Sequence, residues 1–275
     1  MSPARTRTAR TMAVAQREFQ TVLRSRTVAA LAVGYVGLVV GLTLLSAPGG
    51  YLPAVLDLLL PHEVLLPVLG FALGYRAVLG DHDRGEIEAI RTFPVSAGEY
   101  VLGVYLGRLV PLLGVVLLSL VGVGVAVTTA GGGETVSVIA VHNTVDTPVT
   151  FLRFVVVTAV FAAVVLALAV LVSTVARSTR AGLALATGLV LALVVGFDSS
   201  FVAALSGGLV SPADLTALLA LSPNAAYRSL VFSLAVAPTG ASELPVAAAT
   251  LPAALGLVAW FGVSLAAARA VVFRP

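Results

Sequence analysis

Five long stretches without a charged residue constrain this chain more than any other feature. They cover residues 27–56, 109–133, 154–176, 181–197 and 244–268. Each is about long enough to cross roughly 30 Å of hydrocarbon at 1.5 Å per helical residue. Hydrophobic residues make up 59% of the chain, against about 45–50% in soluble proteins. The sequence therefore predicts an all-α protein with several transmembrane helices.

Turn residues and charges between the apolar stretches divide them into six predicted spans. A single membrane domain, residues 1–275, accounts for the whole sequence, and no soluble domain is expected. The spans are residues 28–46, 58–79, 101–128, 154–175, 181–197 (with an extension to 205 as the alternative) and 245–268.

The arginines predict the orientation of these spans. The chain has sixteen basic residues, all of them arginine. With six spans and a cytoplasmic N-terminus, every arginine except Arg153 and Arg228 falls on the inner side. Because basic residues concentrate in cytoplasmic loops, we expect both termini to be cytoplasmic and the protein to be a multi-pass protein of the plasma membrane.

Residues 1–27 precede the first span. Ala15, Phe19, Val22 and Leu23 follow helical spacing within this polar stretch. Such a pattern is typical of an amphipathic helix on a membrane surface.

Residues 206–244, between the fifth and sixth spans, allow two interpretations. The part at 215–236 is apolar, but Ser222-Pro223-Asn224 and Arg228 interrupt it. An arginine in mid-bilayer is costly, so we expect an extracellular pair of short helices or a re-entrant hairpin. A seventh span would place the C-terminal arginines outside.

The loop at 80–99, between the second and third spans, concentrates charge. Seven of the eleven residues 81–91 are ionisable, whereas the whole chain is 11% charged. Residues from Glu86 to Ile90 can form one or two helical turns that end before Pro94. Ile87 and Ile90 would give this helix an apolar edge suited to docking on another protein. A solvated connecting loop is the alternative.

A set of short motifs resembles the ABC-2 type transporter permeases. The motifs are Asp83-Arg84-Gly85-Glu86, Pro94-Val95-Ser96 and the N-terminal Arg17-Glu18-Phe19. The similarity is greatest to the branch that includes the permease of the nitrous-oxide-reductase maturation system. It implies that residues 1–27 form an elbow helix and that 80–99 contains a cytoplasmic coupling helix.

The resemblance also implies partners. A separate ATP-binding subunit would bind ATP and Mg²⁺ and dock on the coupling helix, and a second copy or a paralogue would complete the transporter. We expect it to be an exporter. The chain contains no lysine, so it has no Walker A motif, and we expect no catalytic residue or cofactor in it. The implied partner-binding residues are Arg17, Glu18, Asp81, Asp83, Arg84, Glu86, Glu88 and Arg91.

Ionisable residues near the spans suggest further sites. Asp57, His62 and Glu63 lie near the start of the second span; they are either interfacial or line a substrate pathway at the outer mouth. Arg108, in the third span, either extends to the inner interface or pairs with a carboxylate of the charged loop or of a partner subunit. Asp198 is interpreted as the end of the fifth span.

Other functions are less well supported by the residues. An autonomous secondary transporter would need buried charges for ion coupling and an inverted repeat. A membrane-embedded enzyme would need a catalytic motif on a span, and none is evident. The chain has no cysteine, and we expect no metal site and no nucleic-acid binding.

Overall fold

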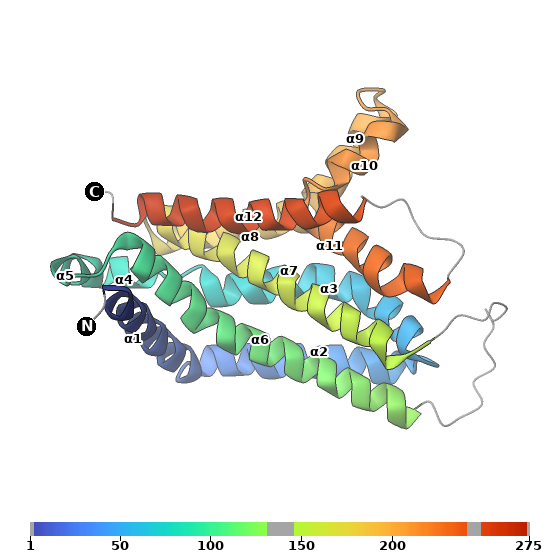
Figure 1. Ribbon diagram of the computed structural model, residues 1–275, viewed down its shortest axis with the longest axis horizontal. Helices are drawn as coiled ribbons and strands as arrows, with labels where there is room; N and C mark the ends of the chain where they lie inside the picture. The colour runs from blue at the N-terminus through green and yellow to red at the C-terminus, as the bar shows by residue number, and fades with distance from the viewer. Residues whose placement is uncertain (1–2, 131–145, 241–248, 274–275) are drawn as a thin grey trace.

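The computed structural model describes residues 3–130, 146–240 and 249–273, and all regular structure within them is helical (Figure 1). In chain order the helices are α1 (Pro3–Leu23), α2 (Arg26–Ser46), α3 (Tyr51–Gly74), α4 (Leu79–Asp83), α5 (Glu86–Thr92), α6 (Ala97–Ala130), α7 (Pro148–Val175), α8 (Thr179–Leu191), η1 (Ala192–Gly196), α9 (Phe197–Ser206), α10 (Pro212–Leu219), α11 (Pro223–Val231), η2 (Phe232–Val236), η3 (Ala237–Thr239) and α12 (Thr250–Val271).

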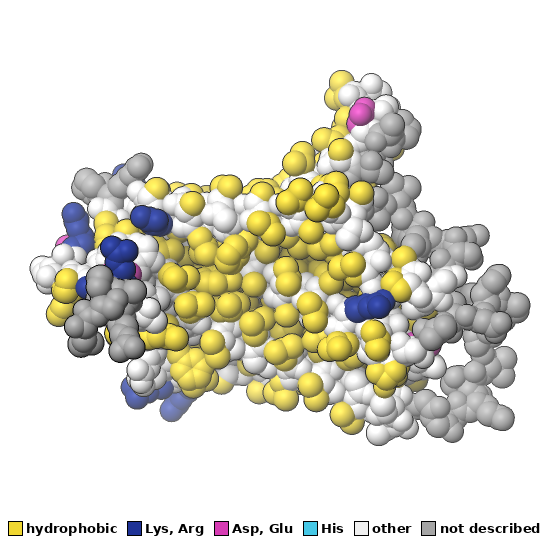
Figure 2. Space-filling model, viewed as in Figure 1, with side chains coloured by type: hydrophobic (Ala, Val, Ile, Leu, Met, Phe, Trp, Pro, Cys, Tyr) yellow, Lys and Arg dark blue, Asp and Glu magenta, His cyan; other side chains and the backbone are white. Residues whose placement is uncertain are grey.

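Six segments of the described chain are long and apolar enough to cross a membrane, which confirms the predicted number. The side of the bundle seen in Figure 2 is covered with hydrophobic side chains along most of its length, as expected of a surface in contact with lipid. The segments are Arg26–Ser46, Tyr51–Asp83, Ala97–Thr129, Pro148–Val175, Thr179–Ser206 and Thr250–Val271.

Both ends of the chain lie at one end of the bundle, together with α1, α4 and α5 (Figure 1). We refer to this end as the terminal end and to the opposite one as the far end. The core between the ends is formed mainly by α3, α6, α7 and α11, and its largest fully buried side chains include Tyr100, Phe154, Phe161 and Tyr227.

Helix α1 lies against the first half of α6, and two glycines of α6 make this close approach possible. A Cβ atom on Gly103 would lie 2.6 Å from Cβ of Val14, and one on Gly107 would lie 2.6 Å from Cβ of Glu18. A Cβ atom on Gly107 would also collide with the backbone carbonyl of Ala15. The absence of side chains here therefore lets the two backbones meet.

We expect Gly107→Val to displace α1 from α6, because the clash is with backbone that cannot rotate away. The matched control is Gly114→Val on the same helix, since a Cβ at Gly114 has no neighbour within 4 Å. Limited trypsin digestion in detergent measures the effect at the arginines of α1. Cleavage there should become at least several-fold faster in Gly107→Val and stay unchanged in Gly114→Val; equal rates in both would contradict the prediction.

The segment after α8 departs from a simple span. The helix passes through the π-helical turn η1 into α9, which buries no side chain and projects with α10 away from the bundle (Figure 1). A Ser-Pro pair begins each of the next two helices: Ser211 and Ser222 cap α10 and α11, and a proline follows each of them. Both pairs match the preferred start of a helix.

Helix α11 is packed into the bundle, against α7 and α12. Eight of its nine residues are buried, and the turn before it is held by Trp260, whose Nε1 donates to the Leu221 carbonyl at 2.9 Å. The residues Ser222-Pro223-Asn224, which interrupt the apolar pattern of the sequence, therefore form the buried N-terminus of a helix.

Candidate functional site

The charged residues gather in two places, and the first lies at the terminal end. We define the terminal cluster as Arg17 and Glu18 of α1, Asp81 of α4, Arg84, Glu86 of α5 and Arg108 of α6. Two of its carboxylates, those of Glu18 and Asp81, are only 2% exposed, so both require partners inside the chain.

Asp81 is the centre of one half of this cluster. Its carboxylate accepts hydrogen bonds from the Tyr100 hydroxyl at 2.6 Å and from Arg84 at 2.6 Å. Arg17 also donates to it. Three donors from different parts of the chain therefore hold Asp81, and they connect α4 to α1 and α6. The start of α4 is anchored as well, since Ser173 Oγ of α7 accepts from the backbone nitrogens of Val78 and Leu79.

Glu18 and Arg108 form the other half. Nε and Nη2 of Arg108 donate to the Glu18 carboxylate at 3.0 and 2.8 Å, and Nη1 donates to the Leu73 carbonyl in α3. The same Glu18 also accepts from Arg17 at 2.8 Å. Arg108 is therefore paired with a carboxylate, but the partner is Glu18 of α1 and not a residue of the charged loop or of a partner subunit. The pair connects α1, α3 and α6.

Helix α5 carries the exposed part of the loop. Gly85 begins it with a φ of 69°, a left-handed conformation that glycine adopts without strain. Ile87 is buried beneath the helix, whereas Glu88, Arg91 and Phe93 are exposed. Ile87 and the partly buried Ile90 therefore attach the helix to the core of this chain. The apolar edge that was expected to dock on another protein faces inward, and the helix presents charges and an aromatic ring outward.

Glu86 connects the exposed helix to the buried cluster. It accepts from Arg84 at 2.6 Å and from Arg17 at 3.4 Å. The hydrogen bond from Arg84 lowers the pKa of Glu86 below its usual value, so this carboxylate stays charged at neutral pH. Asp83 faces a different neighbour: its carboxylate accepts from the Thr179 hydroxyl at 2.8 Å, at the start of α8.

The structure divides the eight residues predicted from the sequence into three groups. Glu18 and Asp81 are buried and bind other residues of this chain. Arg17 and Glu86 are half-buried, Asp83 and Arg84 are exposed, and all four form intramolecular ion pairs or hydrogen bonds. Glu88 and Arg91 are exposed.

The second gathering of charge lies inside the bundle. Arg228 of α11 donates through Nε and Nη2 to both oxygens of Glu63, at 2.7 and 2.5 Å, and through Nη2 to Asp198 of α9 at 2.9 Å. Asn224 donates to the Glu63 carbonyl at 3.0 Å. We define Glu63, Asp198, Asn224 and Arg228 as the mid-bundle cluster, since Glu63 is the thirteenth of the 24 residues of α3.

Polar and aromatic side chains surround this cluster. The His62 ring, fully buried, lies 2.8 Å from the Leu58 carbonyl through Nδ1 and meets Tyr35 and Phe154 edge to face. Thr158 and Tyr227 share a hydrogen bond of 3.0 Å. Within the described chain, Nε2 of His62 and Oδ1 of Asn224 have no hydrogen-bond partner.

The structure separates the three residues that the sequence placed together near the outer end of the second span. His62 and Glu63 point into the bundle, whereas Asp57 is exposed on another side of α3. Their expected common position is therefore wrong: residues 57 and 63 are six apart, which places them about 120° apart around a helix of 3.6 residues per turn. The described residues contain no group of three His, Cys, Asp or Glu side chains that could hold a metal ion.

Sequence reasoning missed the ion pairs that join distant segments. Arg228 was recognised only as an interruption, Asp198 only as the end of a span, and Tyr100 was not singled out. One signal was available, because a basic residue in one apolar segment and an acidic residue in another can pair within a membrane.

The fold and these buried charges define a multi-pass membrane protein with an exposed charged helix at one end. Residues 12–274 match the family described as ABC-2 family transporter protein, and the chain belongs to this family. It is 31% identical over 279 residues to a protein of Pseudomonas aeruginosa named "Probable ABC transporter permease protein NosY", with 95% of this chain and 97% of that protein covered. A protein of Stutzerimonas stutzeri with the same name is 29% identical at the same coverage.

Proposed function

We propose that this chain is the transmembrane subunit of an ABC exporter of the plasma membrane. A separate subunit binds ATP and Mg²⁺, and its hydrolysis of ATP moves a substrate across the membrane. Membership of the ABC-2 family and the six spans support this class of protein. The observation that supports the coupling role is that α5, an exposed charged helix, lies on the terminal cluster with its buried carboxylates.

In this proposal the terminal end of the bundle faces the cytoplasm. The distribution of arginines supports this orientation, since all but Arg153 and Arg228 fall on that side of the six spans. Both termini, α1 and α5 are then cytoplasmic, where an ATP-binding subunit can reach them. Helix α1 takes the role of the family's elbow helix.

The geometry suggests separate roles for the predicted partner-binding residues. Glu88 and Arg91, with the neighbouring Phe93, are the surface that the ATP-binding subunit contacts. Glu18 and Asp81 are buried beneath this surface and hold it in position through their hydrogen bonds. A displacement of α5 is passed through Glu86 and Arg17 to α1, and through Glu18 and Arg108 to α3 and α6. The terminal cluster thus couples the partner to the spans.

Two copies, or one copy and a paralogue, complete the transporter in this proposal. Asp57, His62 and Glu63 remain candidates for the substrate pathway, in different ways. Asp57 is exposed on a spanning helix, so its carboxylate can face a pathway between two subunits. Glu63 is held by Arg228, so it acts on a pathway only through the position of α11.

The test is to reverse the exposed charges of α5. We expect Glu88→Arg combined with Arg91→Glu to reduce the co-purified ATP-binding subunit at least tenfold, because charge reversal at a partner surface opposes docking. The tagged protein is purified from its own host in mild detergent, and the partner and its ATPase activity are quantified. Neither side chain has an intramolecular ion pair in the described chain, so insertion and folding should be unaffected.

The matched control is Asp214→Arg, which reverses an exposed charge on α10 at a distance from α5. This variant should keep the partner at the level of the unmodified protein. Retention of the partner by the double variant would place docking elsewhere on the chain. If no ATP-binding subunit accompanies the unmodified protein, the coupling proposal fails and a secondary transporter or membrane enzyme becomes the better interpretation.

A further inference from the structure

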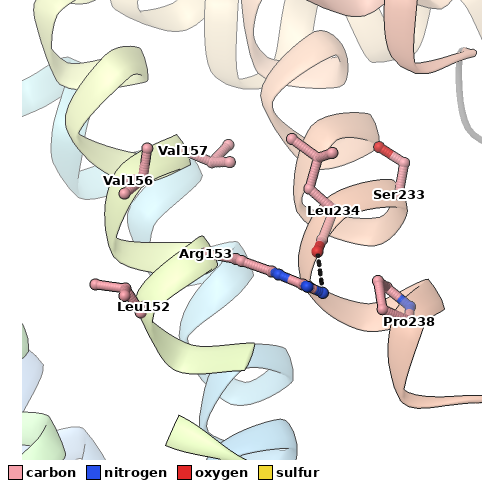
Figure 3. Close-up of a pocket in the computed structure, with 7 residues that line it drawn as sticks. All are labelled: Leu152, Arg153, Val156, Val157, Ser233, Leu234 and Pro238. Carbon is pink, nitrogen blue, oxygen red and sulfur yellow. Dashed lines mark hydrogen bonds between the residues drawn. The ribbon is translucent and has the colours of Figure 1, made fainter. Parts of the chain in front are cut away.

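A cavity of about 490 Å³ lies between α7 and the η2–η3 segment, apart from both ionic clusters (Figure 3). Its walls are almost entirely apolar and include Leu152 and Val156 of α7, Leu234 of η2 and Pro238 of η3. Leu152, Val156 and Leu234 are 59%, 55% and 40% exposed. On a membrane-spanning bundle, exposed apolar walls of this kind face the acyl chains of lipids.

One cation lies in this apolar cavity. The Arg153 side chain extends from α7 towards η2, where Nη1 donates to the Leu234 carbonyl at 3.2 Å (Figure 3). No carboxylate of the described residues forms an ion pair with it, in contrast to Arg108 and Arg228. A guanidinium has five N–H donors, so most of its donors are available to a ligand.

The depth of Arg153 matches the boundary between headgroups and acyl chains. It is the sixth residue of α7, which begins at Pro148, so it lies about 7 Å along the helix from the far end at 1.5 Å per residue. With 28 residues, α7 is about 42 Å long, about 12 Å longer than the hydrocarbon layer of a bilayer. Centred on that layer, the helix extends about 6 Å beyond it at each end, so Arg153 lies close to the boundary. An arginine near the end of a spanning helix extends to the interface, where the phosphates of lipid headgroups are the anions within reach.

From this arrangement we propose that the cavity binds one anionic phospholipid, with its phosphate on Arg153 and an acyl chain along the groove. A guanidinium binds phosphate through two parallel hydrogen bonds, and Leu152, Val156 and Leu234 supply an apolar track for the chain. The cavity volume is within the usual range of ligand sites, about 300–1,000 Å³. An anionic headgroup is preferred over a zwitterionic one, because a choline cation would be repelled by Arg153.

The test is native mass spectrometry of the purified protein with dioleoyl phosphatidylglycerol. Arg153→Gln should weaken binding of the tightest lipid about tenfold, and Val156→Trp should do the same by filling the groove while leaving the charge in place. The control Leu255→Trp adds the same side chain at an exposed position of α12 outside this cavity, and it should bind like the unmodified protein. A thermal melt without lipid verifies that each variant is folded.

Two further ligands distinguish the source of the anion. Dioleoyl phosphatidylcholine should bind at least several-fold more weakly than phosphatidylglycerol, and glycerol 3-phosphate, which lacks chains, should not bind in the same range. The proposal is overturned if Arg153→Gln and Val156→Trp both keep the affinity of the unmodified protein. It is also overturned if phosphatidylcholine binds equally well, or if glycerol 3-phosphate alone occupies the site.

Discussion

Arg228→Leu should destabilise the folded protein by about 3–5 kcal/mol, the range found when one partner of a buried ion pair is removed. Arg228 is the common partner of Glu63 and Asp198. Without it, the buried Glu63 carboxylate loses two hydrogen bonds and stays close to a second carboxylate. Unfolding by titration with SDS in mixed micelles, followed by the fluorescence of the single tryptophan, gives the free energy of unfolding.

Two further variants show whether the buried charge is the cause. Asp198→Asn should cost at most about 1 kcal/mol, because the Asp198 side chain is 34% exposed and partly solvated pairs contribute little. The double variant Glu63→Leu, Arg228→Leu removes both charges and should recover most of the loss. Equal destabilisation by Arg228→Leu and the double variant would mean that arginine acts through packing and not through its charge.

The six spans could be predicted from the sequence because they depend on a local quantity. A helix that crosses lipid needs about 20 apolar residues, and that requirement is visible in any single stretch. The predicted span at 154–175, for example, lies within α7, Pro148–Val175. For the fifth span, the segment Thr179–Ser206 matches the longer alternative, which ended at 205, and not the end at 197. Asp198 suggested the earlier end, but its charge is paired with Arg228.

The ionic clusters could not be predicted in the same way. Glu63 and Arg228 are 165 residues apart, and Glu18 and Arg108 are 90 apart. Nothing in either local sequence indicates the partner, and each charge taken alone indicates an interface or a break. The same limit affected the charged loop. Its density of charge marked it as exposed, yet Asp81 is buried because Arg17, Tyr100 and Arg84 all bind it.

The sequence at the start of α11 favours a helix, but we interpreted it as an interruption of an apolar segment. Ser222 followed by Pro223 is a strong helix start, and the cap is formed, since Ser222 Oγ accepts from the Ala225 nitrogen at 3.3 Å. The charge of Arg228, five residues later, suggested a surface position instead. A buried position became possible only because α3 supplies Glu63 to the same region.

Arg108→Leu is expected to have an effect of similar size, about 3–5 kcal/mol, but at the terminal end. The substitution leaves Glu18 beneath α1 without its main partner, although Arg17 still donates one hydrogen bond to it. It also removes the donor to the Leu73 carbonyl of α3. The same SDS titration measures the loss, and Arg24→Leu, at an exposed arginine of the turn after α1, serves as the control with a cost within about 0.5 kcal/mol.

A double-mutant cycle then separates the ion pair from the packing of the two side chains. If the buried charge dominates, Glu18→Leu combined with Arg108→Leu is more stable than Arg108→Leu alone. Additive losses would contradict this and assign the effect to the Leu73 contact and to helix packing. In the proposed transporter the cycle has a second readout. A folded double variant keeps the packing of α1 on α6 but lacks the ionic connection from α1 to α3 and α6. It should bind the ATP-binding subunit normally through α5 yet transport at less than a tenth of the normal rate.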